Sequence, residues 1–92
     1  MLNFIITDSD KNEKISLVVF ERENGGEWER SKDYYLGGIE EDLEAAEVPC
    51  RDGYYEVCRA EFRGIAEEAE HVLASYCDDV IEYKVDVLDA ED

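Results

Sequence analysis

Residues 64–76 read GIAEEAEHVLASY and carry the clearest periodicity of this 92-residue chain. Apolar side chains at positions 65, 69, 72, 73 and 76 recur at the spacing that places them on one face of an α-helix. Residues 38–47, GIEEDLEAAE, begin in the same way, and Ile39, Leu43 and Ala46 again share one face. We therefore predict two amphipathic helices, one over about 39–47 that ends before Pro49 and one over about 64–76.

Segments with the character of β-strands flank both helices. The stretches LNFIIT (2–7) and ISLVVFERE (15–23) are short and apolar, so each predicts a strand, and the turn residues DSDKNE join them. After the NGG turn at 24–26, the segment EWERSKDYYL (27–36) predicts one edge strand or two short ones. Residues 54–62 and 81–87 alternate in polarity and predict two half-buried strands, the first with Tyr54, Cys58 and Phe62 on one face.

This order of elements predicts an α+β fold. Two helices among four or five strands suit a small, mostly antiparallel sheet with both helices packed on one of its faces. A right-handed crossover through the second helix would make the last two strands parallel within that sheet. The length fits a single compact domain over 1–92, and the polar end of the chain predicts a frayed acidic tail over about 88–92.

The charge balance is the outlying property of the composition. Asp and Glu number 26 against 9 Lys and Arg, which gives a formal net charge of -17 at pH 7. The hydrophobic fraction of 45% is too high for a disordered acidic tail, so the chain is expected to fold. Such a charge disfavours direct binding to nucleic acid or to an anionic membrane. It favours basic protein surfaces, most of which bind nucleic acid themselves.

The cysteines and the apolar runs bear on the compartment and on chemistry. The first residues, MLNFIITDSD, lack the basic region of a signal peptide, and the longest apolar run, LVVF, is too short to span a bilayer. We therefore expect a cytoplasmic protein with free thiols. The positions of Cys50, Cys58, His71 and Cys77 match no metal-ligand spacing, and no catalytic motif is present, so we expect no metal, no cofactor and no enzymatic activity.

Carboxylates crowd the outer faces of both predicted helices. The first helix has no basic residue and the second has only His71. Like charges three or four positions apart on a helix cost roughly a few tenths of a kcal/mol per pair, so a surface under no other demand would intersperse lysines. A row of carboxylates at this spacing resembles a run of phosphates and suits a site built for a polyanion. The residues predicted to contact such a partner are Glu40, Glu41, Glu44, Glu47, Glu67 and Glu70, with Trp28 and Tyr35 as aromatic candidates.

In size, charge and compactness the chain resembles the small acidic proteins that phages and mobile elements use against host defence, such as anti-CRISPR proteins and DNA mimics. No motif carries this resemblance, so it transfers no individual residue. It implies a non-enzymatic inhibitor that blocks the DNA or RNA site of a basic nucleic-acid-handling protein, for example a CRISPR effector, a restriction enzyme or a nuclease. A phage-encoded inhibitor of this kind would act in the host cytoplasm.

Two other functions fit the same composition. An immunity protein that neutralises a basic nuclease toxin would use the same electrostatic attraction, with fast and tight association. A small housekeeping domain of a salt-adapted organism would carry its acids as a solvated surface, and the low lysine count of four agrees with that.

Overall fold

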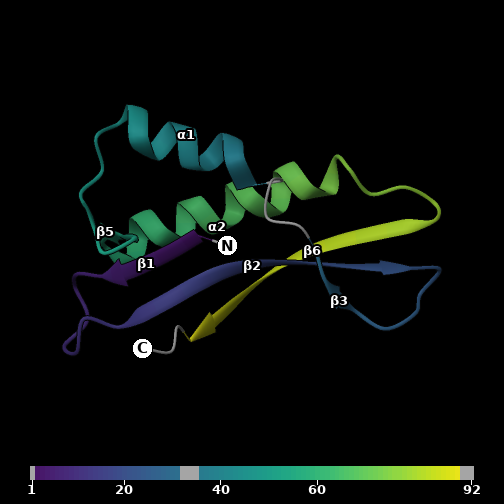
Figure 1. The fold of residues 1–92 in the computed structure, drawn as a ribbon, viewed down its shortest axis with the longest axis horizontal. Helices are drawn as coiled ribbons and strands as arrows, with labels where there is room; N and C mark the ends of the chain where they lie inside the picture. The colour runs from purple at the N-terminus through teal and green to yellow at the C-terminus, as the bar shows by residue number, and fades with distance from the viewer. Residues whose placement is uncertain (1, 32–35, 90–92) are drawn as a thin grey trace.

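The computed structural model describes residues 2–31 and 36–89, and within them six strands form one mixed sheet with both helices on one face (Figure 1). The predicted α+β class with a mostly antiparallel sheet is confirmed. Neither described helix is long and apolar enough to cross a membrane. In chain order the elements are β1 (Leu2–Ile6), β2 (Lys14–Glu23), β3 (Glu29–Arg30), α1 (Gly37–Ala45), β4 (Cys50–Arg51), β5 (Tyr54–Val57), α2 (Arg59–Ala74) and β6 (Ile81–Asp89).

The ten-residue strand β2 is the centre of the sheet. β6 lies antiparallel along one side of β2, from Ile81 opposite Glu23 to Asp89 opposite Ile15. β1 and β3 share the other side, and both are antiparallel to β2. β5 then pairs parallel to β1, and β4 pairs antiparallel to β5. β5 and β6 therefore run in the same direction, as predicted, but β1 and β2 lie between them.

Alternation along β1 and β2 builds the core between the sheet and the helices. Leu2, Phe4 and Ile6 of β1 are buried in this core, and the ring of Phe4 meets that of Phe62 edge to face with 5.2 Å between the centroids. Burial of apolar surface contributes roughly 25 cal/mol per Å², so this layer holds both helices on the sheet. The buried helix residues are Ile39 and Leu43 from α1 and Phe62, Ala69 and Leu73 from α2.

The strand predicted over 54–62 is correct only at its start. β5 ends at Val57, and the residues that follow begin α2. Within β5 the buried side chains are Tyr55 and Val57, so the buried face is the opposite of the one assigned to Tyr54 and Phe62. Phe62 still reaches the core, but it does so from the helix.

A capping box at Cys58 explains the early start of α2. The Sγ of Cys58 accepts a hydrogen bond from the N–H of Glu61 at 3.5 Å, and the Glu61 carboxylate accepts one from the N–H of Cys58 at 3.2 Å. These bonds satisfy donors of the first turn. The Cys58 side chain and, after it, the Cys58 backbone N–H hold the pKa of the Glu61 carboxyl below its ordinary value. Because α2 begins at Arg59, it contains Arg59 and Arg63, and the prediction of His71 as its only basic residue is wrong. The two helices therefore do not begin alike.

Smaller differences concern the ends of elements. α1 begins and ends two residues earlier than predicted, which leaves Ala46 exposed beyond it. Tyr76 was predicted on the apolar face of the second helix, but it lies beyond the end of α2 and is 52% exposed. Leu88 and Asp89 pair with β2 instead of fraying. The rest of the predicted tail and the predicted site residue Tyr35 lie outside the described residues.

Candidate functional site

Four of the predicted glutamates belong to α1 and to the turn that follows it. Ile39 and Leu43 are buried against the sheet, so the other positions of this helix turn their side chains toward solvent. No basic residue lies in α1. The exposed glutamates of this segment are Glu40, Glu41, Glu44 and Glu47.

Two of these carboxylates lie near the buried ring of Tyr55 on β5. Burial raises the pKa of the Tyr55 phenol, and the negative charges of Glu40 and Glu44 raise it further. Glu40 and Glu44 are therefore close enough to Tyr55 of β5 to act on its phenol electrostatically.

The remaining predicted glutamates, Glu67 and Glu70, are exposed on α2. Glu70 lines a groove of about 230 Å³ between α2 and β6, together with Leu73, Cys77 and Val85. Glu67 precedes Glu70 by about one helical turn and therefore lies on the same side of α2. Since β6 and β5 are separated by β1 and β2, the predicted glutamates are divided between two flanks of the helices.

The six glutamates at positions 40, 41, 44, 47, 67 and 70 are called the acidic helix layer below. Within residues 2–31 and 36–89, no salt bridge reaches any of them. Four of the basic residues pair with other acids instead. These pairs are Arg22–Glu82 at 2.9 Å, Arg51–Glu56 at 3.4 Å, Arg59–Glu13 at 3.3 Å and Lys84–Asp86 at 3.3 Å.

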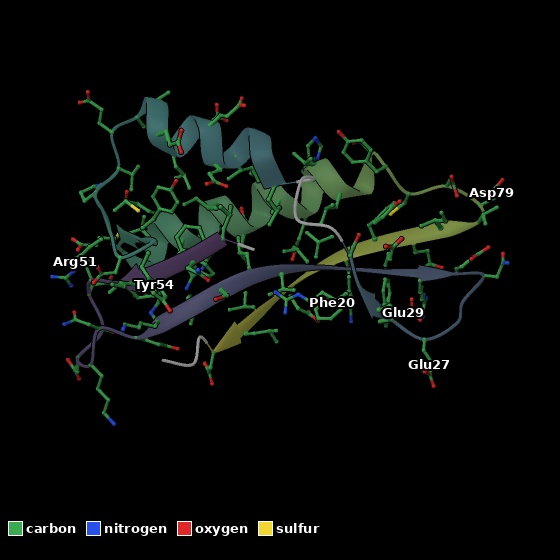
Figure 2. The ribbon with its side chains drawn as sticks, in the orientation of Figure 1. Phe20, Glu27, Glu29, Arg51, Tyr54 and Asp79 are labelled. Atoms are coloured by element: carbon green, nitrogen blue, oxygen red, sulfur yellow. The ribbon has the colours of Figure 1, made fainter. Side chains whose placement is uncertain are left out.

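The sheet face that points away from the helices, called the open face, holds a cluster of aromatic rings and cations. The Arg22 guanidinium lies 4.5 Å and the Lys84 ammonium 4.6 Å from the centroid of the Trp28 ring. The Phe20 ring lies 5.7 Å from the same ammonium, on the side of β2 away from the helices (Figure 2). Trp28, predicted to anchor a partner, is thus engaged by two cations of its own chain and does not join the acidic helix layer.

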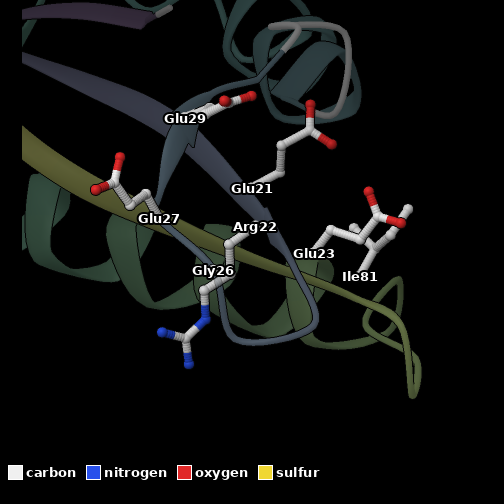
Figure 3. A pocket seen from close by; sticks show the side chains of 7 residues that line it. All are labelled: Glu21, Arg22, Glu23, Gly26, Glu27, Glu29 and Ile81. Atoms are coloured by element: carbon white, nitrogen blue, oxygen red, sulfur yellow. The ribbon is translucent and has the colours of Figure 1, made fainter.

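An acidic hollow of about 260 Å³ lies where β2 turns toward β3 (Figure 3). The Arg22 guanidinium points to the other side of β2 from the carboxylates of Glu21 and Glu23, because neighbouring side chains on a strand alternate. Sequence reasoning missed this hollow, although alternating glutamates on both sides of the NGG turn are a signal for it. Among the residues that the structure describes, no group of three or more His, Cys, Asp or Glu side chains is placed to hold a metal ion. The lining residues are Glu21, Arg22, Glu23, Gly26, Glu27, Glu29 and Ile81.

Comparisons with known proteins give no match, whether against family models, curated proteins or solved structures. Support for a function therefore comes from the surfaces themselves. Among the described residues, the acidic helix layer and the groove between α2 and β6 are features that could receive a partner.

Proposed function

We propose that this chain is a non-enzymatic inhibitor that places its acidic helix layer in the nucleic-acid-binding cleft of a basic protein. The observation that carries the proposal is the separation of charge. The acidic helix layer has no salt bridge among the described residues. Arg22, Arg51 and Lys84 are paired with acids of the sheet, and Arg59 at the start of α2 is paired with Glu13. Charge left without partners on one side of a small domain attracts a cationic surface and steers the encounter with it.

The spacing of the helix carboxylates supports a partner that binds a polyanion. Side chains three or four positions apart on a helix have Cβ atoms about 5–6 Å apart. Phosphates advance about 3.4 Å per nucleotide along one strand of DNA, which is comparable in scale. The pairs Glu40–Glu44 and Glu67–Glu70 have these helical spacings. A groove that holds phosphates would lose its counterions to such carboxylates, as it does to nucleic acid.

The division of the acidic helix layer between two flanks favours a concave partner. Glu40 and Glu44 lie toward β5, whereas Glu70 lies beside β6. A flat basic surface would contact one flank at a time, and a cleft could contact both. Clefts lined with basic residues are typical of proteins that enclose a nucleic acid, and the resemblance to anti-defence proteins narrows the class to a CRISPR effector, a restriction enzyme or a nuclease.

The test is a retention experiment with two variants of equal charge change. The immobilised chain is exposed to a nuclease-treated lysate of the source cell or of its host at 50 and 500 mM NaCl. The helix variant is Glu41→Lys/Glu44→Lys. The matched control is Asp10→Lys/Asp79→Lys, because both positions are exposed, lie outside the helices and form no salt bridge among the described residues (Asp79 is labelled in Figure 2).

The wild type and the control are expected to retain basic proteins at 50 mM NaCl and to release them at 500 mM NaCl or on addition of duplex DNA. The helix variant is expected to lose this retention. Equal retention by both variants, or retained proteins that duplex DNA does not displace, would contradict the proposal.

A further inference from the structure

The outer edge of β6 is the longest strand edge that the described residues leave partly open. β6 pairs with β2 on one side, and no other described strand lies on its outer side (Figure 1). Asn24 donates a hydrogen bond to the carbonyl of Val80 at 2.8 Å, which sets the phase of the ladder. Even-numbered residues of β6 therefore exchange hydrogen bonds with β2, and odd-numbered residues direct their N–H and C=O groups outward.

The chain itself covers the first part of this edge. The backbone N–H of Asp78 donates to the Ile81 carbonyl at 3.0 Å, and the Asp78 carboxylate accepts the Ile81 N–H at 2.7 Å. The N–H of Tyr83 donates to the Sγ of Cys77 at 3.3 Å. The outward groups of Val85 and Val87 have no hydrogen-bond partner among the described residues. A thiol is a weak hydrogen-bond acceptor, so a backbone carbonyl of another strand can readily replace the Cys77 Sγ as the acceptor of the Tyr83 N–H.

Exposed apolar side chains gather around the same edge. Large apolar residues that remain exposed in the described part of the chain are Tyr76, Val80, Val87 and Leu88, with exposed fractions of 52%, 46%, 50% and 42%. All of them lie in β6 or in the segment that leads into it. An exposed strand edge with apolar side chains pairs readily with another strand unless charge or shape prevents it.

We propose that β6 pairs antiparallel with β6 of a second copy of this chain, with Val85 opposite Val85 at the two-fold axis. Val85 is the middle residue of β6, so this register pairs Val85 with Val85 and Val87 with Tyr83, whose hydrogen bond to the Cys77 Sγ is replaced. The groups of Ile81 stay covered by Asp78. Each exposed Val87 then meets Tyr83 of the other copy on the helix side of the sheet. On the open face, Lys84 of each copy lies opposite Asp86 of the other, in a non-hydrogen-bonded pair where side chains are closest.

Charge distinguishes this register from its neighbours. Outward groups must face outward groups, so the alternatives differ by shifts of two residues along one strand. One such shift places Lys84 opposite Lys84, and the other places Asp86 opposite Asp86. Like charges directly opposite each other destabilise a strand pair, whereas opposite charges stabilise it. The register centred on Val85 is therefore the charge-matched arrangement of greatest overlap.

The two-fold axis of such a pair is perpendicular to the sheet, which places the helices of both copies on one side. The dimer would therefore present two acidic helix layers side by side on one continuous sheet. Two chains of net charge -17 repel each other, so dimerisation should become tighter as salt is added. This inference stands independently of the proposed function, because it concerns pairing of the chain with itself.

The test is sedimentation equilibrium of the full chain at 500 mM NaCl, with single and combined charge reversals. Lys84→Glu places a glutamate opposite Asp86 in both symmetry-related pairs. Asp86→Lys places a lysine opposite Lys84 in both pairs. Each substitution alters two symmetry-related pairs, so each is expected to weaken the dimer by about fourfold or more. An equimolar mixture of the two variants restores opposite charges at both pairs and is expected to form a heterodimer, detected by retention of the untagged variant on the tagged one.

The double variant Lys84→Glu/Asp86→Lys is expected to dimerise as the wild type does. Circular dichroism of each variant establishes that it is folded. A wild type that stays monomeric up to millimolar concentration would overturn the inference. Dimers that both single variants preserve, or a mixture that forms no heterodimer, would overturn this register.

Discussion

Replacing Glu44 with lysine should raise the free energy of unfolding, even though Glu44 is exposed and lies outside the hydrophobic core. Glu44 lies in the last turn of α1, where the backbone carbonyls form the negative end of the helix dipole, and this turn has no basic residue. Glu40 and Glu41 precede it by four and three positions and share its side of the helix. The native carboxylate therefore meets unfavourable charge from three sources.

The magnitude follows from these three contacts. A like-charge pair at this spacing costs about 0.2–0.5 kcal/mol and an opposite-charge pair gains a similar amount, so each of the two pairs changes by about 0.4–1 kcal/mol. Exchange of an acid for a base at the end of the helix adds about 0.6–2 kcal/mol at low ionic strength, because an unfavourable charge is removed and a favourable one is gained. Because the site is exposed and partly screened, we expect the lower part of this sum, about 1–2 kcal/mol in the free energy of unfolding.

The assays are urea unfolding and thermal unfolding, both followed by circular dichroism in 20 mM and 500 mM NaCl. At low salt the gain of Glu44→Lys corresponds to a rise in Tm of about 4–8 °C per kcal/mol for a domain of this size. Glu44→Gln removes the repulsion without adding attraction and should gain about half as much. Asp10→Lys changes the net charge equally in a loop and serves as the control.

The reasoning would be refuted if Glu44→Lys did not raise the free energy of unfolding at 20 mM NaCl. It would also be refuted if the rise were equally large at 500 mM NaCl. The helix carboxylates would then not repel one another measurably. The charge separation that supports the proposed function would lose its physical basis, because unpaired charge that costs nothing is simply solvated.

Three further outcomes follow from individual contacts. Cys58→Ala should lower the free energy of unfolding by about 0.5–1 kcal/mol through loss of the α2 cap, whereas Cys58→Ser, with an oxygen acceptor, should match or exceed the wild type in urea unfolding. Trp28→Leu removes the ring held by Arg22 and Lys84 and should cost about 1–2 kcal/mol, read as a lower Tm. Two backbone N–H groups hold the pKa of Asp78 below its ordinary value, so its contribution to stability is complete above about pH 4 and is lost as the pH falls through the lowered pKa. Asp78→Asn should therefore flatten the stability profile between pH 5 and 2.

The sequence predicts elements that local periodicity defines. It misses the start of a helix whose N-cap residue is not one of the preferred types. The apolar repeat of residues 64–76 identifies α2 because its period alone requires a helix. Its true start was not predicted, because cysteine is not among the preferred N-cap residues and the alternation through Phe62 also fits a strand. The Glu61 side chain three positions after Cys58 is the signal that was available.

The exposure of the six glutamates could be predicted from the sequence, but their arrangement could not. All six glutamates are exposed, and helical periodicity suffices to predict that. Their division between the β5 flank and the β6 flank depends on how α1 and α2 lie across the sheet, which no local pattern contains. Trp28 shows the same limit, because its two cations, Arg22 and Lys84, come from strands far apart in the sequence.

The net charge gives the two proposed associations opposite responses to salt. Docking of the acidic helix layer on a cationic cleft gains from counterion release, so its affinity falls as ionic strength rises. Pairing of β6 with a second copy works against repulsion between two chains of charge -17, so its affinity rises over the same range. If the dimer is the form that docks, binding to the partner should pass through a maximum at intermediate salt. If the monomer docks, binding should decline steadily, and Lys84→Glu should leave that decline unchanged.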